Sequence, residues 1–206
     1  MGVRRRPRQV FEVTGGNLAL DLANTKERRP TARSEEHLHE FDDLVSWGEQ
    51  AGAIVAKEGG GLRALAAGRP QAARAALARA IDLREVLFEL FSTVAGHRPL
   101  PEPALARLNA ALPAALARLR LAVGDGGAAW TWAPAVHLER VLWPTLRAAA
   151  ALLTSPDRER VRECAARDCA WLFLDRSRNG SRRWCDMAVC GNREKARRFQ
   201  SRSHRL

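Results

Sequence analysis

The sequence predicts a mainly α-helical N-terminal domain with one small β-hairpin, followed by a small cysteine-bearing module made of a β-hairpin and a helix. Three observations carry this prediction. A stretch at about residues 70–95 repeats apolar side chains at helical spacing. Residues 118–133 alternate apolar and other side chains around a Gly-rich turn. Every cysteine of the chain falls between residues 164 and 190.

The distribution of charge divides the chain in the same way. Residues 1–8 carry four arginines and no acid, and residues 157–206 carry 14 Lys or Arg against 7 Asp or Glu. Residues 9–156 hold 16 basic and 16 acidic side chains, which cancel. A localised basic patch is typical of proteins that bind a polyanion, either nucleic acid or an anionic membrane. We therefore predict a basic tail at 1–8, an α-rich domain at 9–157 and a C-terminal module at 158–206.

The apolar segments do not predict a membrane protein. No apolar segment of signal-peptide type follows the basic start, and an apolar run such as residues 148–153 is far too short to span a bilayer. We expect a cytoplasmic protein with no membrane partner. Thiols stay reduced in that compartment, so the cysteines are expected to bind a metal rather than to form disulfides.

The first helix is expected directly after a glycine pair. In "FEVTGGNLALDLANT", Gly15-Gly16 forms a turn and Asn17 is suited to cap a helix that begins at residue 18. The leucines at every second position from Leu18 also fit a strand. We favour the helix.

Helix signals recur along the rest of this domain. Asp42 or Asp43 is expected to cap a helix that Gly52 ends, and the glycines of residues 57–61 are expected to break the chain flexibly. The strongest helix spans about 70–95, with an apolar stripe of Ala76, Ala80, Leu83, Leu87, Leu90 and Phe91.

Three further elements complete the predicted domain. A shorter helix is expected around 103–112, and the hairpin around Gly-Asp-Gly-Gly follows it. The stretch at residues 136–155 predicts a helix that is interrupted near Pro144.

The four cysteines follow a C-x4-C-x15-C-x4-C pattern. Zinc prefers four tetrahedral sulfur ligands, and each closely spaced pair brings two sulfurs onto one ion. We predict one structural Zn²⁺ held by Cys164, Cys169, Cys185 and Cys190. A redox dithiol, an iron–sulfur cluster and four unrelated buried thiols are the alternatives.

The residues around the cysteines predict the shape of the module. "AWLFLD" and "RRWC" are expected to form two strands around an Asn-Gly turn, and the residues after Cys190 are expected to be helical. On that helix Asn192, Ala196 and Phe199 should face the hairpin. Trp171 and Trp184 should pack under the module, or one exposed ring could stack on a base. The outline is that of a treble-clef-like zinc finger.

A family resemblance becomes specific at this point. "CAARDCAWLFLDRSRNGSRRWCDMAVCGNREKARRF" resembles the CGNR zinc finger, named after the tetrapeptide at residues 190–193. "GGNLALDLANT" at 15–25 resembles the opening motif of the ABATE domain, which commonly precedes this finger. The resemblance implies zinc ligation by the four cysteines. It also implies a stress-induced transcriptional regulator with a DNA-binding finger.

The arginines of the finger are the predicted nucleic-acid contacts. A zinc scaffold would present them as one cationic face, and several are expected to pair with nearby acids such as Asp168 or Glu194. The predicted set is Arg176, Arg178, Arg182, Arg183, Arg193, Lys195, Arg197, Arg198, Arg202 and Arg205. A solvated arginine-rich tail is the alternative interpretation.

Few other residues indicate chemistry. Asp21, Asn24 and Thr25 cluster beside an apolar face, where they line a ligand pocket or cap the helix end. His37 and His39 are expected at the surface, and Arg84 with Glu85 is expected to form a buried ion pair.

We therefore predict a non-enzymatic regulator that binds duplex DNA through its finger. The N-terminal domain would sense a small-molecule effector or form a homodimer. Two alternatives remain open. The finger would instead bind RNA or a protein, or the N-terminal domain would act as an enzyme on a small molecule.

Overall fold

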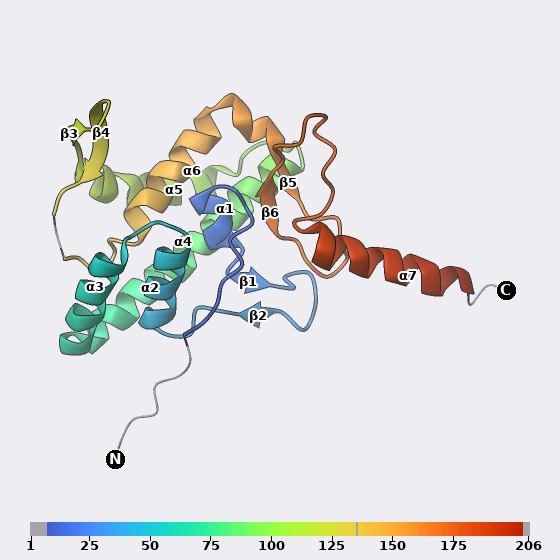
Figure 1. The fold of residues 1–206 in the computed structure, drawn as a ribbon, viewed down its shortest axis with the longest axis horizontal. Coiled ribbons are helices and arrows are strands. Elements are labelled where there is room, and N and C mark those ends of the chain that lie inside the picture. The colour runs from blue at the N-terminus through green and yellow to red at the C-terminus, as the bar shows by residue number, and fades with distance from the viewer. Residues whose placement is uncertain (1–7, 135, 204–206) are drawn as a thin grey trace, which may run out of the picture.

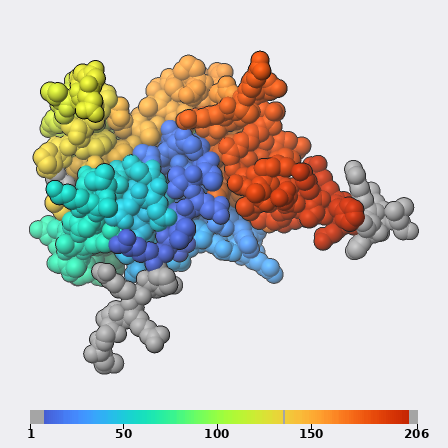
Figure 2. Space-filling model, viewed as in Figure 1, coloured from blue at the N-terminus to red at the C-terminus, as the bar shows by residue number. Residues whose placement is uncertain are grey.

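The computed structural model describes residues 8–134 and 136–203, without the side chains of Arg202 and Ser203. A helical body occupies one side of the molecule and the cysteine-bearing module the other (Figure 1). The space-filling view shows the two regions in direct contact (Figure 2). The long helix α4, Pro70–Ala95, runs through the body and contacts α1, α2, α3, α5 and two strands of the module.

Short helices surround α4 and small hairpins join them. The helices of the body are α1 Leu18–Ala23, α2 Phe41–Gln50, α3 Ala56–Gly68, α5 Glu102–Leu116 and α6 Leu142–Thr154. The hairpins are β1 Lys26–Glu27 with β2 Glu35–Glu36, β3 Leu119–Gly124 with β4 Gly127–Trp132, and β5 Val161–Glu163 with β6 Leu172–Leu174, all antiparallel. A 3-10 turn at Pro156–Arg160 leads into β5, and a π-helical turn at Met187–Gly191 leads into α7, Asn192–Ser203. Among the described helices, none is apolar over a length that would cross a membrane.

Several predicted elements are present. Asn17 caps α1, because its Oδ1 accepts a hydrogen bond from the Ala19 N–H at 2.9 Å. All six residues of the predicted stripe on α4 are buried. The predicted hairpin pairs Leu119 with Trp132 through Gly124 with Gly127. The fold class, mainly helical with small hairpins and a C-terminal hairpin-and-helix module, is confirmed.

Two predictions about α2 and α3 are wrong in detail. Glu40 precedes α2, while Asp43 sits in its first turn and accepts hydrogen bonds from the His39 and Glu40 N–H groups. The glycines at 57–61 lie inside α3 and do not break the chain. A Cβ at Gly59 would meet the Glu49 carboxylate at 1.9 Å. Close packing of α3 on α2 therefore outweighs the low helix propensity of glycine.

The prediction for the last helix of the body also needs correction. α6 begins at Leu142, so Pro144 lies in its first turn and does not interrupt it. A proline costs little there, because the first N–H groups of a helix have no intrahelical partner.

The strands of the module are not the predicted pair. β6 is the predicted "LFL" strand, but its partner is β5, before Cys164, and the residues around Arg183 and Trp184 form no strand. Val161, Leu172 and Leu174 of this hairpin belong to the hydrophobic core of the helical body. The short strands are therefore positioned by packing on α1 and α4, which local sequence does not reveal.

Candidate zinc centre and basic face

The four cysteines converge at the junction of the hairpin and α7. Their sulfurs all lie within 4.8 Å of one another, and all four residues are buried, unbridged thiols. The Cys185 Sγ lies 3.6 Å from the Sγ atoms of both Cys169 and Cys190. Four Zn–S bonds of about 2.3 Å in a tetrahedron separate the sulfurs by about 3.8 Å. The cluster therefore fits one zinc ion.

The local sequence explains how the first pair of cysteines is held. β5 leads into Cys164, and β6 begins three residues after Cys169, the last residue of a turn. Ala170 takes a left-handed backbone conformation, with φ of 63°, which redirects the chain into β6. The Cys164 N–H donates to the Trp171 carbonyl at 2.8 Å, closing the loop that holds both sulfurs.

The second pair is positioned by two aspartates. Asp175, fully buried, accepts hydrogen bonds from the Ser177 and Arg182 N–H groups and so folds the loop that returns the chain to Cys185. Asp186 accepts from the Val189 N–H and caps the π-helical turn. Gly191 closes this turn, where a Cβ would lie 2.4 Å from the Met187 sulfur.

The close packing of the four thiols couples their ionisation. Hydrogen bonds from Cys169 and Cys185 lower the pKa of Cys164 to about 2, so one thiolate forms readily. The same interactions raise the pKa of Cys169 and Cys185 far above that of a free thiol, because each donates to that thiolate. Zinc binds thiolates, so a bound cation would favour the deprotonated form of all four sulfurs.

An arginine supplies positive charge beside the sulfurs. Arg193 donates to the Cys190 Sγ at 3.2 Å and forms an ion pair with Asp168 at 3.0 Å. Four thiolates around Zn²⁺ carry a net charge of −2, and this contact offsets part of it. Arg193 therefore supports the metal centre.

Arg197 also has a structural position. It forms ion pairs with Asp168 at 2.7 Å and with Glu194 at 2.5 Å, which tie α7 to the loop between the first two cysteines. These contacts lower the pKa of Asp168 and raise that of Arg197. The expectation that nearby acids pair with the arginines is met here.

The predicted apolar face of α7 is wrong. Asn192, Ala196 and Phe199 are exposed, and Phe199 is 74% exposed. Gly191 and Glu194 are the buried residues at the start of the helix. The helix therefore meets the module through ion pairs rather than through apolar packing.

The predicted nucleic-acid residues fall into two groups. The anchored group consists of Arg182, which donates to the Trp184 and Cys185 carbonyls, together with Arg193 and Arg197. The exposed group is Arg176, Arg178, Arg183, Lys195 and Arg198. Arg205 and the side chain of Arg202 lie outside the described residues.

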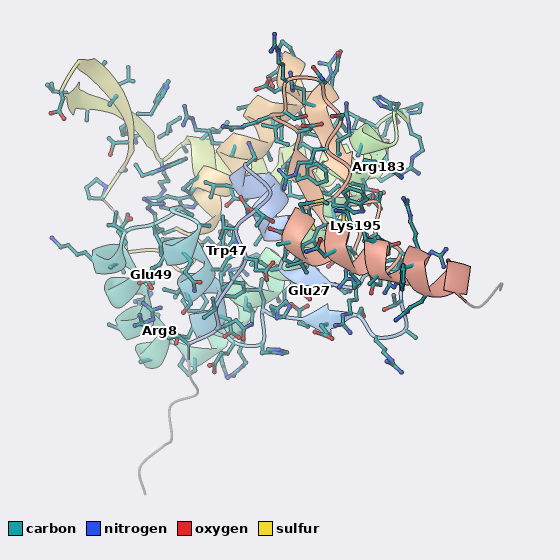
Figure 3. All side chains as sticks on the ribbon, turned by 45° about the vertical axis from the view of Figure 1, so that its right-hand side comes forward. Arg8, Glu27, Trp47, Glu49, Arg183 and Lys195 are labelled. Carbon is teal, nitrogen blue, oxygen red and sulfur yellow. The ribbon has the colours of Figure 1, made fainter. Side chains whose placement is uncertain are left out.

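The exposed group forms few contacts within the protein. Arg176 donates to the Gly16 carbonyl at 3.3 Å, and the Arg183 guanidinium lies over the Trp184 ring. No acid among the described residues pairs with Arg178, Lys195 or Arg198. Lys195 projects from α7, and Arg183 is on the same module (Figure 3). The module therefore presents cations that its own acids do not neutralise.

The tryptophans pack as predicted. Trp171 is buried in the cluster of the four cysteines and Phe173, and Trp184 is half-buried against it. The Trp171 Nε1 has no hydrogen-bond partner among the described residues.

Asn24 connects the helical body to the finger. Its side chain donates to the Leu172 carbonyl and accepts from the Leu172 N–H, both at 2.8 Å. The Leu174 N–H donates to the Gly15 carbonyl at 2.8 Å. The "GGNLALDLANT" motif thus supplies hydrogen-bond partners to the backbone of β6 on the edge that faces away from β5. We call these contacts of Gly15 and Asn24 the seam.

The other two residues of the predicted pocket support the same motif. Asp21 accepts from the Gly15 N–H at 2.7 Å, and burial raises its pKa to about 6. Thr25 donates to the Leu22 carbonyl. Asp21, Asn24 and Thr25 do line one cavity of about 90 Å³, together with Trp171. Their polar groups are largely occupied by the protein itself.

Two predictions outside the finger differ in outcome. His39 is exposed as expected, but His37 is half-buried and lies 3.2 Å from Glu27, which raises the pKa of His37. Arg84 is buried and pairs with Glu85 at 2.8 Å, and it also pairs with Glu36 at 2.5 Å.

The contacts of Gly15 and Asn24 with β6 were not predicted, although both residues lie in a motif that the sequence singled out. Asn24 and Leu172 are 148 positions apart, so no local pattern joins them. The usable signal was the resemblance of both segments to families that occur together.

Comparison with protein families supports this architecture. The ABATE family, described as "Putative stress-induced transcription regulator", matches residues 16–156. The CGNR zinc finger matches residues 160–203. No curated protein matches the chain. Because the first match covers more than half of the chain, the protein belongs to the ABATE family and carries a CGNR zinc finger.

Proposed function

We propose that the protein is a transcriptional regulator that binds duplex DNA through its zinc finger. The observation that carries this proposal is the set of exposed cations Arg178, Lys195 and Arg198 on the zinc-finger scaffold, to which no acid in the described part of the finger is paired. Family membership supports the regulatory role, and the charge supports a polyanion as its partner.

The contacts are expected to be mainly with phosphates. Exposed lysine and arginine side chains supply charge, whereas base discrimination needs a fixed donor and acceptor geometry. In this proposal Arg193 and Arg197 stabilise the finger through their ion pairs with Asp168, whereas the exposed group contacts the phosphates.

A salt titration tests the proposal. Each phosphate contact releases counterions, so log K falls by about 0.9 per contact for each unit of log salt on duplex DNA. Changing Arg178, Lys195 and Arg198 together to Ala should reduce that slope by up to about 2.7 and weaken specific and random duplexes alike.

A matched variant controls for total charge. Lys57, Arg74 and Arg107 are exposed on α3, α4 and α5, and changing all three to Ala removes the same charge from the helical body instead of the finger. This control should leave the slope almost unchanged. Equal slopes for the two triple variants would refute a DNA-binding finger, and tighter binding to single-stranded RNA than to duplex DNA would favour the RNA alternative.

The helical body has a separate role in this proposal. Its charges cancel over residues 9–156, so it adds little to phosphate binding. We propose that the helical body mediates association between copies of the chain. We also propose that any small-molecule effector binds in the cavity beside the seam, where it would contact both the body and the finger.

A further inference from the structure

The β3–β4 hairpin carries an exposed apolar surface that the zinc centre does not explain. In its register Leu121 lies opposite Trp130 and Val123 opposite Ala128, so these four side chains share one side of the hairpin. We call them the hairpin face. Val123 is 98% exposed, Leu121 62% and Trp130 56%.

This surface continues an apolar strip that begins in the body. Trp132, on the same side at the base of the hairpin, packs on the Trp143 ring of α6 at 6.0 Å. Farther out, Arg147 of α6 lies over the Trp130 ring at 5.4 Å, and beyond it the strip meets solvent. An isolated two-stranded hairpin is marginally stable in water, so a projecting one benefits from a covering partner.

The position and charge of the hairpin favour a second copy of the chain as that partner. The hairpin lies at the end of the molecule opposite α7 (Figure 1), so two chains joined there keep their basic fingers apart. Residues 119–132 carry only Arg120 and Asp125, which cancel. The hairpin itself therefore carries no net charge, although the whole chain carries +11, and Arg147 over the Trp130 ring is the cation beside the hairpin face.

The size of the surface is also sufficient for a modest dimer. The exposed parts of the hairpin face amount to roughly 400 Å² of apolar surface, a size that often marks an interaction site. Two copies facing each other about a twofold axis remove roughly 800 Å² from water. This area lies below the ~1,200–2,000 Å² that stable interfaces bury, so the dimer is expected to be weak.

We propose that the hairpin face is the surface through which two copies of the chain form a symmetric homodimer. The twofold places each Val123 near its counterpart, because the same face serves both copies. This proposal does not depend on DNA binding.

Sedimentation equilibrium of the full zinc-loaded chain, free of nucleic acid, tests it. The mass of the wild type should rise from 22.8 kDa towards twice that value as the protein concentration is raised. Val123→Glu should weaken dimerisation by about 100-fold or more, because each dimer would bury two unpaired carboxylates. Ala122→Glu is the matched control, since Ala122 is exposed on the same strand but on the opposite side.

The outcomes separate the proposal from its rivals. A dimeric wild type and Ala122→Glu with a monomeric Val123→Glu would support it, provided that both variants keep full zinc and wild-type circular dichroism. A monomeric wild type would overturn it, as would a Val123→Glu variant that stays dimeric. Equal loss of the dimer in both variants would place the interface elsewhere.

Discussion

The helical body and the zinc finger are stabilised by different forces. The body buries a continuous apolar core around α4, from Leu20 to Leu152. The finger buries four cysteines with Trp171 and Phe173, and ion pairs hold its last helix. Its hairpin nevertheless lends Val161, Leu172 and Leu174 to the core of the body. The finger is too small to form a large hydrophobic core of its own. It is therefore stabilised by the zinc site on one side and by packing against the core of the body on the other.

The largest effect should come from removing one zinc ligand. Cys185→Ser leaves three sulfurs, and structural zinc in small fingers is worth roughly 10–16 kcal/mol of apparent binding free energy. We expect less than one zinc per chain and loss of near-ultraviolet signal from Trp184. Metal analysis of the purified variant checks this, and full zinc occupancy in Cys185→Ser would contradict the four-cysteine assignment.

A smaller effect should follow from breaking the seam. Asn24→Ala leaves the buried N–H and C=O groups of Leu172 without their side-chain partner, which costs about 2–4 kcal/mol of unfolding free energy. Asn17→Ala is the control, because it removes only the cap of the same helix, at about 1 kcal/mol. Urea unfolding of the zinc-loaded chains measures both. Equal losses would mean that Asn24 does not join the two regions.

The raised pKa of Asp21, which accepts from Gly15 beside the seam, should make the free energy of unfolding depend on pH. Its pKa of about 6 in the folded protein exceeds the ordinary value of about 3.9, so folding favours the protonated form. Its contribution is complete below about pH 4 and is lost as the pH rises through about 6. Asp21→Asn should therefore stabilise the protein at pH 7 by up to about 3 kcal/mol, since an amide oxygen can still accept from Gly15.

The dependence of stability on pH separates the effect of removing the Asp21 charge from a change in packing. The gain of Asp21→Asn over the wild type in unfolding free energy should increase between pH 5 and pH 7. A gain that is constant over that range would assign the effect to packing rather than to ionisation.

The smallest effect should come from the ion pairs of α7. Asp168→Ala removes the partner of Arg193 and Arg197, but these side chains are partly exposed, so the loss should be about 1 kcal/mol or less. High salt should reduce the difference from wild type. Thermal unfolding at two salt concentrations measures it, with Asp157→Ala as an exposed control. A loss independent of salt would contradict an ionic role.

Local patterns predicted what depends on local spacing. The helix at α4, the β3–β4 hairpin and the Asn17 cap follow from periodicity, turn glycines and capping chemistry. The pairing of β5 with β6 did not follow, since three-residue strands are fixed by their packing on α1 and α4.

The candidate site shows the same division. The cysteine spacing predicted the cluster, which depends on two short loops. The exposure of Phe199 was missed, because ion pairs of Arg193 and Arg197 with Asp168 hold α7 on the module in place of apolar packing. Pairing of arginines with Asp168 was expected, but which arginines it holds depends on the packing of two distant segments of the finger.

The central claim is that zinc stabilises one side of the finger and that the seam stabilises the other. Hydrogen exchange of the full chain, measured with zinc bound and after chelation, tests this most directly. Chelation should accelerate exchange from Cys185 through α7, while the Leu172 and Leu174 amides stay protected by Asn24 and Gly15. The α4 amides should not change. Equal loss of protection in β6 and α7, or unchanged protection throughout the finger, would contradict this account.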